Sequence, residues 1–340
     1  MKLKKKIALI LVAVLSMTLF LTGCAGKNKE ETVNLKVAEV THSIFYAPQY
    51  VAISEGFFEK EGLEIELIAG QGADKTMAAL LSGEVQIGFM GPEASIYVYN
   101  QESKDYAVSF AQVTKRDGSF LVGREKDDDF KFEKLKGKEL IGGRKGGMPE
   151  MTLEYTIKNN GLEIGKNVDK GQVNVRTDVQ FNVMAGAFTA GEGDFVTLFE
   201  PTATELEKQG QGYIVASIGE ESGEIPYTAY CALKSYIDKN PEIIQRFTNA
   251  VNEGLVYVKE HSAEEIAKSI APFFTEMKEE DLITVVQRYK DIDAWCENPL
   301  LKEDSLNRLM EVMELAGELD KRAPYEKIVT TEFAEKVIKK

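Results

Sequence analysis

The chain has 340 residues, of which 44% are hydrophobic and 28% are charged, and its formal net charge is −14 at pH 7. This length permits one large domain or two lobes with separate cores, and the apolar content is ordinary for a globular protein. A chain this acidic is not expected to bind nucleic acids or anionic membrane surfaces, because like charges repel. The net charge does not exclude a small anionic ligand.

The first 23 residues are typical of an export signal. Four lysines within residues 2–6 precede an apolar run of about 15 residues, 7–21, which is shorter than the roughly 20 residues of a membrane-spanning helix. The run ends at Leu21-Thr22-Gly23-Cys24, which resembles the bacterial lipobox. The resemblance implies cleavage before Cys24 and a lipid on its thiol, which would hold the protein on the extracytoplasmic face of the cell membrane. A plain signal peptide followed by an incidental cysteine is the alternative.

After a polar tether over residues 24–33, the sequence alternates short strand patterns with helix patterns. In one predicted helix, Met77, Leu80 and Leu81 recur at helical spacing and Gly83 follows as a stop. Such alternation with short loops favours a parallel sheet covered by helices. The expected strands are 33–40, 63–69, 85–90 and 106–113, and the expected helices are 48–58, 74–82 and 94–101.

A second series of strands and helices follows, and beyond residue 235 the pattern becomes one of successive amphipathic helices. Residues 115–118 are interpreted as a passage from one lobe to the next, and residues 223–230, with Pro226, as the return. The expected strands here are 119–124, 138–143, 172–177, 194–199 and 212–218, and the expected helices are 149–159, 179–190 and one from 201.

These series predict an α/β clamshell of two Rossmann-like lobes with two chain crossings. Lobe I would hold residues 34–116 and 228–340, including the C-terminal helices, and lobe II residues 117–227. Ligands of open α/β sheets bind beyond the carboxyl ends of the strands, so both sets of strand-end loops would face one cleft. Hinge closure about the crossings would bury the ligand.

The loops at these strand ends are rich in glycine and proline. Glycine lets backbone N–H groups approach a ligand, and Pro92, Pro149 and Pro201 suit the first turn of a helix, where free N–H donors attract anions. Interpretations without a ligand stay open. Glu93 and Glu200 could each serve only to stabilise the positive end of a helix dipole. Gly146-Gly147 could be only a tight turn, and Arg144-Lys145 only a solvated charge pair.

Three segments resemble one known family: residues 46–52 (YAPQYVA), 56–63 (GFFEKEGL) and 79–88 (ALLSGEVQIG). They are similar to the nitrate/sulfonate/taurine and thiamine-pyrimidine group of periplasmic binding proteins, the substrate-binding subunits of ABC importers. The resemblance covers roughly residues 34–260. It implies a type II bilobal fold, a monomer, a small-molecule ligand, and ABC permease subunits as membrane partners.

The resemblance also implies a set of ligand contacts. Sulfonates and nitrate would need N–H donors and cations such as Arg144, whereas heterocycles would need stacking aromatics and carboxylates such as Glu93 and Glu200. Two carboxylates near one cleft would repel an anion, which favours the heterocycle. The implied contacts are Ser43, Phe45, Tyr46, Gly70, Gln71, Gly72, Gly91, Pro92, Glu93, Arg144, Lys145, Gly146, Gly147, Met148, Thr197, Glu200 and Thr228.

No motif for catalysis, for a cofactor or for a metal is visible. The sequence has no Cys-x-x-Cys pair and only two histidines, His42 and His261, so a structural zinc site is not expected. Cys231 and Cys296 are either a disulfide or two buried thiols. An enzyme on the same fold is the main alternative, but the related pyrimidine synthases carry a CCCFC motif that this chain lacks. A structural or adhesive lipoprotein is a further alternative.

Overall fold

The computed structural model describes residues 32–339, so the predicted signal peptide, its cleavage site and Cys24 lie outside the described residues. The chain divides after Val33, and the unit Asn34–Lys340 carries nearly all of the described fold. Within the described residues, no helix combines the length and the hydropathy needed to cross a bilayer.

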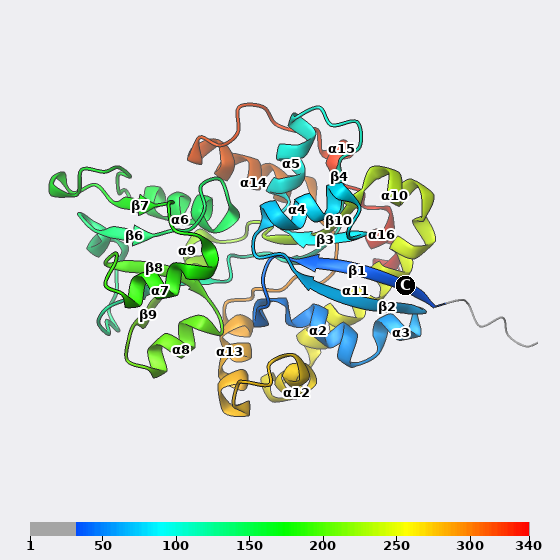
Figure 1. Ribbon diagram of the computed structural model, residues 1–340, viewed down its shortest axis with the longest axis horizontal. Helices are drawn as coiled ribbons and strands as arrows, with labels where there is room; N and C mark the ends of the chain where they lie inside the picture. The colour runs from blue at the N-terminus through cyan, green and yellow to red at the C-terminus, as the bar shows by residue number, and fades with distance from the viewer. Residues whose placement is uncertain (1–31, 340) are drawn as a thin grey trace, which may run out of the picture. The chain divides into compact units, whose positions relative to one another are not determined.

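Two five-stranded sheets form the core of this unit (Figure 1). Their strands are β1 (Val33–Glu39), β2 (Leu63–Ala69), β3 (Ile87–Met90), β4 (Ala107–Thr114), β5 (Ser119–Gly123), β6 (Glu139–Ile141), β7 (Asn174–Arg176), β8 (Phe195–Phe199), β9 (Tyr213–Ser217) and β10 (Thr228–Leu233). The strand order is β2-β1-β3-β10-β4 in the first sheet and β7-β6-β8-β5-β9 in the second. The predicted strands are therefore present, close to their expected bounds.

Both sheets are mixed, so the predicted parallel pairing is only partly right: β1 pairs in parallel with β3, and β6 in parallel with β7 and β8. Strand β10 lies between β3 and β4 and runs antiparallel to both, whereas β5 runs antiparallel to β8 and β9. The sequence analysis treated residues 223–230 as a connection because Pro226 interrupts them. The strand begins only two residues after that proline, and all of its residues but Leu233 are buried.

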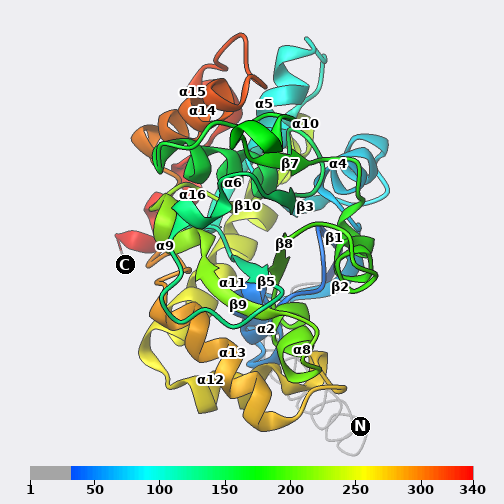
Figure 2. The ribbon, with the colours of Figure 1, turned by 90° about the vertical axis from the view of Figure 1, so that its left-hand side faces the viewer.

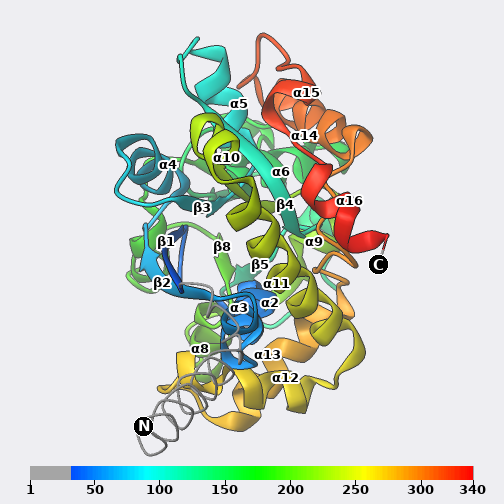
Figure 3. The same ribbon diagram turned by 90° about the vertical axis from the view of Figure 1, so that its right-hand side faces the viewer.

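Helices cover both faces of the first sheet. On one face, Met77, Leu80 and Val98 pack with strand residues that include Cys231. On the other, the Phe247 ring of a long helix meets Phe110 and Tyr230, and Figure 3 shows this helix, α11, crossing the view. The helices around this sheet are α2 (Ala47–Ser54), α3 (Phe57–Lys60), α4 (Ala73–Ser82), α5 (Glu93–Asn100), α10 (Lys234–Lys239), α11 (Pro241–Glu260), α12 (Ala263–Ile270), α15 (Tyr325–Ile328) and α16 (Glu332–Ile338).

The helix expected from residue 48 to 58 is divided in two. Gly56, at φ 70, separates α2 from α3. A left-handed residue ends a helix, and glycine adopts that conformation with little strain.

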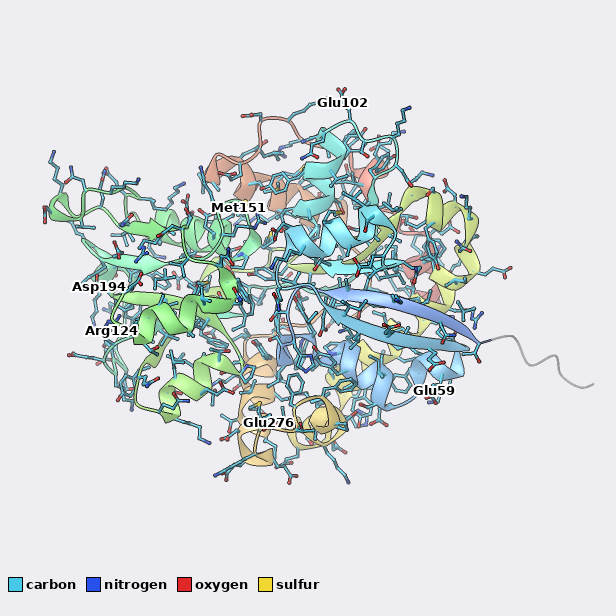
Figure 4. All side chains as sticks on the ribbon, in the orientation of Figure 1. Glu59, Glu102, Arg124, Met151, Asp194 and Glu276 are labelled. Atoms are coloured by element: carbon cyan, nitrogen blue, oxygen red, sulfur yellow. The ribbon has the colours of Figure 1, made fainter. Side chains whose placement is uncertain are left out.

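The second sheet is also covered on both faces (Figure 2). Val122 belongs to one apolar cluster with Phe188, and its neighbour Leu121 belongs to the opposite cluster with Ile157, as strand alternation requires. Arg124, labelled in Figure 4, closes this end of the sheet by donating to the carbonyl oxygens of Phe188 and Gly193. The covering helices are α6 (Met148–Asn159), α7 (Met184–Thr189), α8 (Thr202–Lys208) and α9 (Ile218–Ser222).

Two C-terminal helices, α13 (Glu279–Asp291) and α14 (Glu303–Ala316), contact helices that cover the second sheet: α13 pairs with Lys208 of α8, and α14 contacts α6. The Arg308 guanidinium of α14 donates to the hydroxyl of Tyr155 on α6. Lys158 Nζ, also on α6, donates to the carbonyl oxygen of Leu315 at 2.8 Å. Residues 228–340, assigned to lobe I from sequence, thus include segments that pack on lobe II as well.

The chain passes between the sheets twice, and the two passages are joined. The backbone N–H groups of Ile225 and Tyr227 donate to the carbonyl oxygens of Lys115 and Thr114 at 2.9 and 3.1 Å. Gly118 lies here because any Cβ would strike the ring of Phe45. Both sheets are thus anchored to one compact junction that lies beside the strand ends.

Candidate ligand-binding site

A cavity of about 350 Å³ lies where strand-end loops of both sheets meet, within the usual range for small-molecule sites. The first sheet contributes the loops after β1, β2 and β3, and the second contributes the loops after β6 and β7 and the last residue of β8. Its lining comprises Val40, Thr41, Tyr46, Gln71, Gly72, Ala73, Asp74, Lys75, Gly91, Glu93, Gly143, Arg144, Gly147, Met148, Pro149, Thr177, Asp178, Val179, Gln180, Phe181, Asn182, Phe199, Tyr227 and Thr228.

Glu93 is the buried charge of this cavity. It opens α5 and is 1% exposed, and its Oε2 has no hydrogen-bond partner among the described residues. Gly91 leaves room for the Glu93 carboxylate. A Cβ at position 91 would overlap Glu93 Oε2 and come within 2.7 Å of Met148 Cγ. Burial raises the pKa of Glu93 to about 7, and backbone N–H groups and Arg144 oppose that rise. An unpaired buried carboxylate beside a cavity is a candidate acceptor for a ligand N–H group.

Aromatic rings form much of the remaining wall. The ring centroids of Phe181 and Phe199 are 5.8 Å apart, and those of Phe199 and Tyr227 are 6.2 Å apart. Tyr46 completes this set from the first sheet and is 5% exposed. Rings on both walls offer faces and edges on which a flat ligand can stack.

The positive charges lie toward the outside. Arg144 is 46% exposed, and its Nε is 3.9 Å from Asp74 Oδ1 of α4, across the cavity from it. Lys145 is 67% exposed, pairs with Glu318 at 3.1 Å and does not line the cavity. Arg144 is therefore available to a ligand only in competition with Asp74.

The structure gives Glu200 a different role from the one predicted. Its carboxylate is fully buried: Oε2 accepts from the Thr204 N–H at 2.9 Å, and Oε1 accepts from the Thr204 hydroxyl at 2.8 Å and from Arg288 at 2.7 Å. It caps α8 and neutralises a guanidinium from α13. This set of contacts argues against Glu200 as the acceptor for a ligand amine.

Nine of the predicted contacts line the cavity, and eight do not. Ser43, Thr197 and Glu200 line a second, adjoining cavity. Phe45 lies behind the wall, where the Trp295 indole N–H donates to its carbonyl oxygen at 2.9 Å. The nine that line it are Tyr46, Gln71, Gly72, Gly91, Glu93, Arg144, Gly147, Met148 and Thr228; those that line neither cavity are Phe45, Gly70, Pro92, Lys145 and Gly146.

The sequence analysis missed the loop 177–182, which closes the second-sheet side of the cavity. Residues from 179 were assigned to a helix, but α7 begins only at Met184, after a short 3-10 turn, Phe181–Val183. The same rule that selected the other strand-end loops applies to the loop after β7. It would have found these residues had the helix start been placed later.

The described residues contain neither a candidate metal site nor a disulfide. Within 32–339 no group of three or more His, Cys, Asp or Glu side chains is placed to hold a metal ion. Cys231 and Cys296 are buried free thiols, and burial raises the pKa of Cys231 to about 12. Of the two alternatives left open for these cysteines, the structure contains the unpaired thiols.

Comparison with known proteins places the chain in a family. Residues 44–265 match the family described as NMT1/THI5 like. The chain belongs to the NMT1/THI5-like family. YtlA of Bacillus subtilis (strain 168), named as a candidate binding protein, is 44% identical over 322 residues, 95% of each chain. A 4-amino-5-hydroxymethyl-2-methylpyrimidine phosphate synthase of Aspergillus parasiticus is 24% identical over 225 residues, 63% of each chain.

The fold is that of periplasmic binding proteins. The alkanesulfonate-binding protein SsuA from Xanthomonas axonopodis pv. citri, solved with MOPS bound, superposes with a TM-score of 0.69 at 14% identity, over 88% of this chain and 99% of its own. The predicted family resemblance and the predicted bilobal α/β fold are confirmed. At this level of identity the similarity establishes the fold but does not identify the ligand.

Proposed function

We propose that this protein is the solute-binding subunit of an ABC importer and that it captures a small heterocycle bearing an amine in the interlobe cavity. The family, the fold and the similarity to YtlA support the receptor role. The ligand passes unchanged to permease subunits in the membrane, which recognise the closed receptor. The receptor acts as a monomer.

The buried carboxylate of Glu93 is the main reason for proposing a heterocycle rather than an anion as the ligand. Oε2 lacks a partner among the described residues, and no lysine or arginine lies in a salt bridge with this group. A ligand N–H group would give this oxygen a partner, whereas a sulfonate or nitrate would bring a second negative charge to it. The surrounding rings suit a flat aromatic molecule.

An anionic ligand is the competing hypothesis for the same cavity. Arg144 and the N-terminus of α6, with Pro149 in its first turn, favour it. Asp74 already faces Arg144, and Glu93 lies on the same cavity. The balance of charge around the cavity therefore favours the heterocycle.

An enzymatic role on this fold is the second hypothesis, since the Aspergillus parasiticus synthase is a distant relative. Glu93 has a raised pKa, as catalytic acids often do, but the chain lacks the CCCFC motif of the synthases. Turnover separates the two roles, because a receptor returns its ligand unchanged. Recovery of intact ligand after denaturing the complex is expected.

A thermal-shift screen of residues 25–340 tests the proposed ligand class. One panel holds 4-amino-5-hydroxymethyl-2-methylpyrimidine and related aminopyrimidines, and the other holds taurine, alkanesulfonates and nitrate. A ligand at 100 times its dissociation constant stabilises the native state by about 2.7 kcal/mol. Stabilisation by the first panel supports the proposal, and stabilisation by the second alone would make Arg144 the anchor and refute it.

We further propose that a lipid on Cys24 anchors the receptor outside the cytoplasmic membrane. The lipobox-like sequence and the polar tether support the anchor. A Cys24→Ser substitution is expected to release the protein from the membrane fraction, measured by fractionation and immunoblotting. Unchanged membrane retention of the variant would refute lipidation at this residue.

A further inference from the structure

A second cavity of about 270 Å³ adjoins the first. The two share part of their lining, so they lie side by side, and they are named the first and second chambers. The shared residues are Thr41, Gln71, Phe181, Asn182 and Phe199.

The second chamber presents no uncompensated charge among its described lining residues. Its charged residues are Glu200 and His42, and Arg288 neutralises Glu200 at 2.7 Å. His42 Nδ1 is 3.1 Å from the Glu39 carboxylate, and Nε2 is 2.8 Å from the carbonyl oxygen of Phe273. The Tyr50 hydroxyl also lies 3.1 Å from Nδ1, so both ring nitrogens already have partners within the protein. The hydrogen bond to Glu39 accordingly raises the pKa of His42.

One polar atom of this chamber is buried and free. Thr197 is 3% exposed, and its Oγ1 has no partner among the described residues. Ser43, beside it in the lining, differs: its hydroxyl donates to the carbonyl oxygen of Glu200 at 2.7 Å and accepts from the Phe45 N–H at 3.3 Å. A buried hydroxyl without a partner lowers stability, and Thr197 lines a cavity in which a ligand group can supply that partner.

The residue between the chambers has an unusual backbone. Gln71 has φ 58, in the left-handed region that side chains other than those of Asn and Asp rarely adopt. Gln71 belongs to the lining of both chambers. Backbone strain at a residue that touches both chambers is typical of a ligand contact.

We propose that the second chamber receives an uncharged hydrogen-bonding extension of the ligand, such as a hydroxyl or an amide, and that Thr197 is the residue that selects it. This inference rests on the proposed function, since it assumes that a heterocycle occupies the first chamber. A hydroxyl both donates and accepts, so Thr197 recognises neutral polar groups. A sulfonate or phosphate extension is disfavoured, because His42 is already paired with Glu39 and no other cation is among the described lining residues.

Titration calorimetry on the purified full chain tests this assignment. The probes are 4-amino-5-hydroxymethyl-2-methylpyrimidine and three of its ethers, which carry propyl, 2-hydroxyethyl and 2-sulfoethyl groups. The 2-hydroxyethyl ether is expected to bind at least about fivefold more tightly than the propyl ether of the same length, in line with one net hydrogen bond. The 2-sulfoethyl ether is expected to bind most weakly.

Three variants locate the effect. Thr197→Val removes the hydroxyl at nearly constant volume and is expected to abolish the preference for 2-hydroxyethyl, whereas Thr197→Ser keeps the hydroxyl and the preference. Thr152→Val is the matched control, because Thr152 Oγ1 is also buried without a described partner but lines neither chamber. Thermal melting of each variant reports on its folding.

The outcomes separate this inference from the proposed function. Binding of the parent pyrimidine without any preference between the two ethers leaves the proposed function intact and overturns the role of the second chamber. A preference that survives in Thr197→Val, or is lost equally in Thr152→Val, also overturns it. Failure of the wild-type protein to bind any of the four probes overturns both.

Discussion

Two buried glutamates occupy similar places in the two halves of the molecule and have opposite surroundings. Glu93 follows β3 and Pro92 at the start of α5, and Glu200 follows β8 and precedes Pro201 at the start of α8. Each is 1% exposed. Arg288 neutralises Glu200, and Thr204 donates a hydrogen bond to it. Glu93 instead keeps one carboxylate oxygen without a partner among the described residues, beside the cavity.

The difference shows what decides the role of a buried carboxylate. Local sequence supplies a carboxylate and a helix N-terminus in both places. The partner of Glu200 comes from α13, 88 residues further along the chain. A buried charge that is paired holds the fold together, and one that is left unpaired is available to a ligand.

The largest expected effect is on stability, at the paired glutamate. Among the described residues, Glu200→Gln leaves Arg288 with the Glu207 carboxylate and the Thr204 hydroxyl as partners. Removing one member of a fully buried pair costs 3–5 kcal/mol, and Arg288 is 29% exposed, so we expect a loss of roughly 2–3 kcal/mol. Urea unfolding measures it, and the double variant Glu200→Gln, Arg288→Met should recover part of the loss. Normal stability with weakened ligand binding would show that the two glutamates act alike.

The corresponding change at the unpaired glutamate should affect binding instead. Glu93→Gln keeps the shape and removes the charge, and hydrogen bonds to charged groups are worth roughly 1.5–3 kcal/mol. We therefore expect the aminopyrimidine to bind about 10- to 100-fold more weakly, measured by titration calorimetry. Stability should hold or rise, because a buried charge has been removed. Unchanged affinity would remove Glu93 from the site.

The affinity should also depend on pH, because burial raises the pKa of Glu93 to about 7. The carboxylate is the acceptor, so affinity falls by up to about tenfold for each pH unit below that value. The profile of Glu93→Gln should be flat, which separates this titration from that of any group on the ligand.

Stability has the opposite dependence on pH. Burial holds the pKa of Glu93 in the folded protein above the ordinary value of 4.5 for this carboxyl, so its protonated form stabilises the fold. This contribution is complete below about pH 4.5 and is lost as the pH rises through about 7. Asp117 adds to the same trend, since burial raises its pKa to about 7 as well. Stability that falls on acidification over this range would contradict both assignments.

Much of the fold and part of the site could be predicted from sequence, for a local reason. Strand alternation, helical spacing and Gly or Pro stops are short-range signals, and they placed most elements within a few residues. The rule that strand ends bear ligand sites then selected Glu93, Arg144 and Gly91, all of which line the cavity.

The errors share a different cause, which is dependence on distant partners. Nothing near Glu200 in the sequence indicates Arg288. The antiparallel entry of β10 between β3 and β4 is a tertiary choice, and the loop 177–182 was hidden by an early helix start. Such features become visible only when segments far apart in the chain are brought together.

The smallest expected effect tests whether the outer charges matter to the ligand. Asp74 and Arg144 are 57% and 46% exposed and 3.9 Å apart, and exposed pairs of this kind contribute less than about 1 kcal/mol. Asp74→Asn and Arg144→Met should each change the affinity for the aminopyrimidine by less than about fivefold, as measured by titration calorimetry. If the ligand were an anion, the two substitutions would act in opposite directions, since removing Asp74 would free Arg144 to bind it. Small effects from both variants, beside a large effect from Glu93→Gln, would therefore make the buried charge and not the exposed pair the determinant of the ligand.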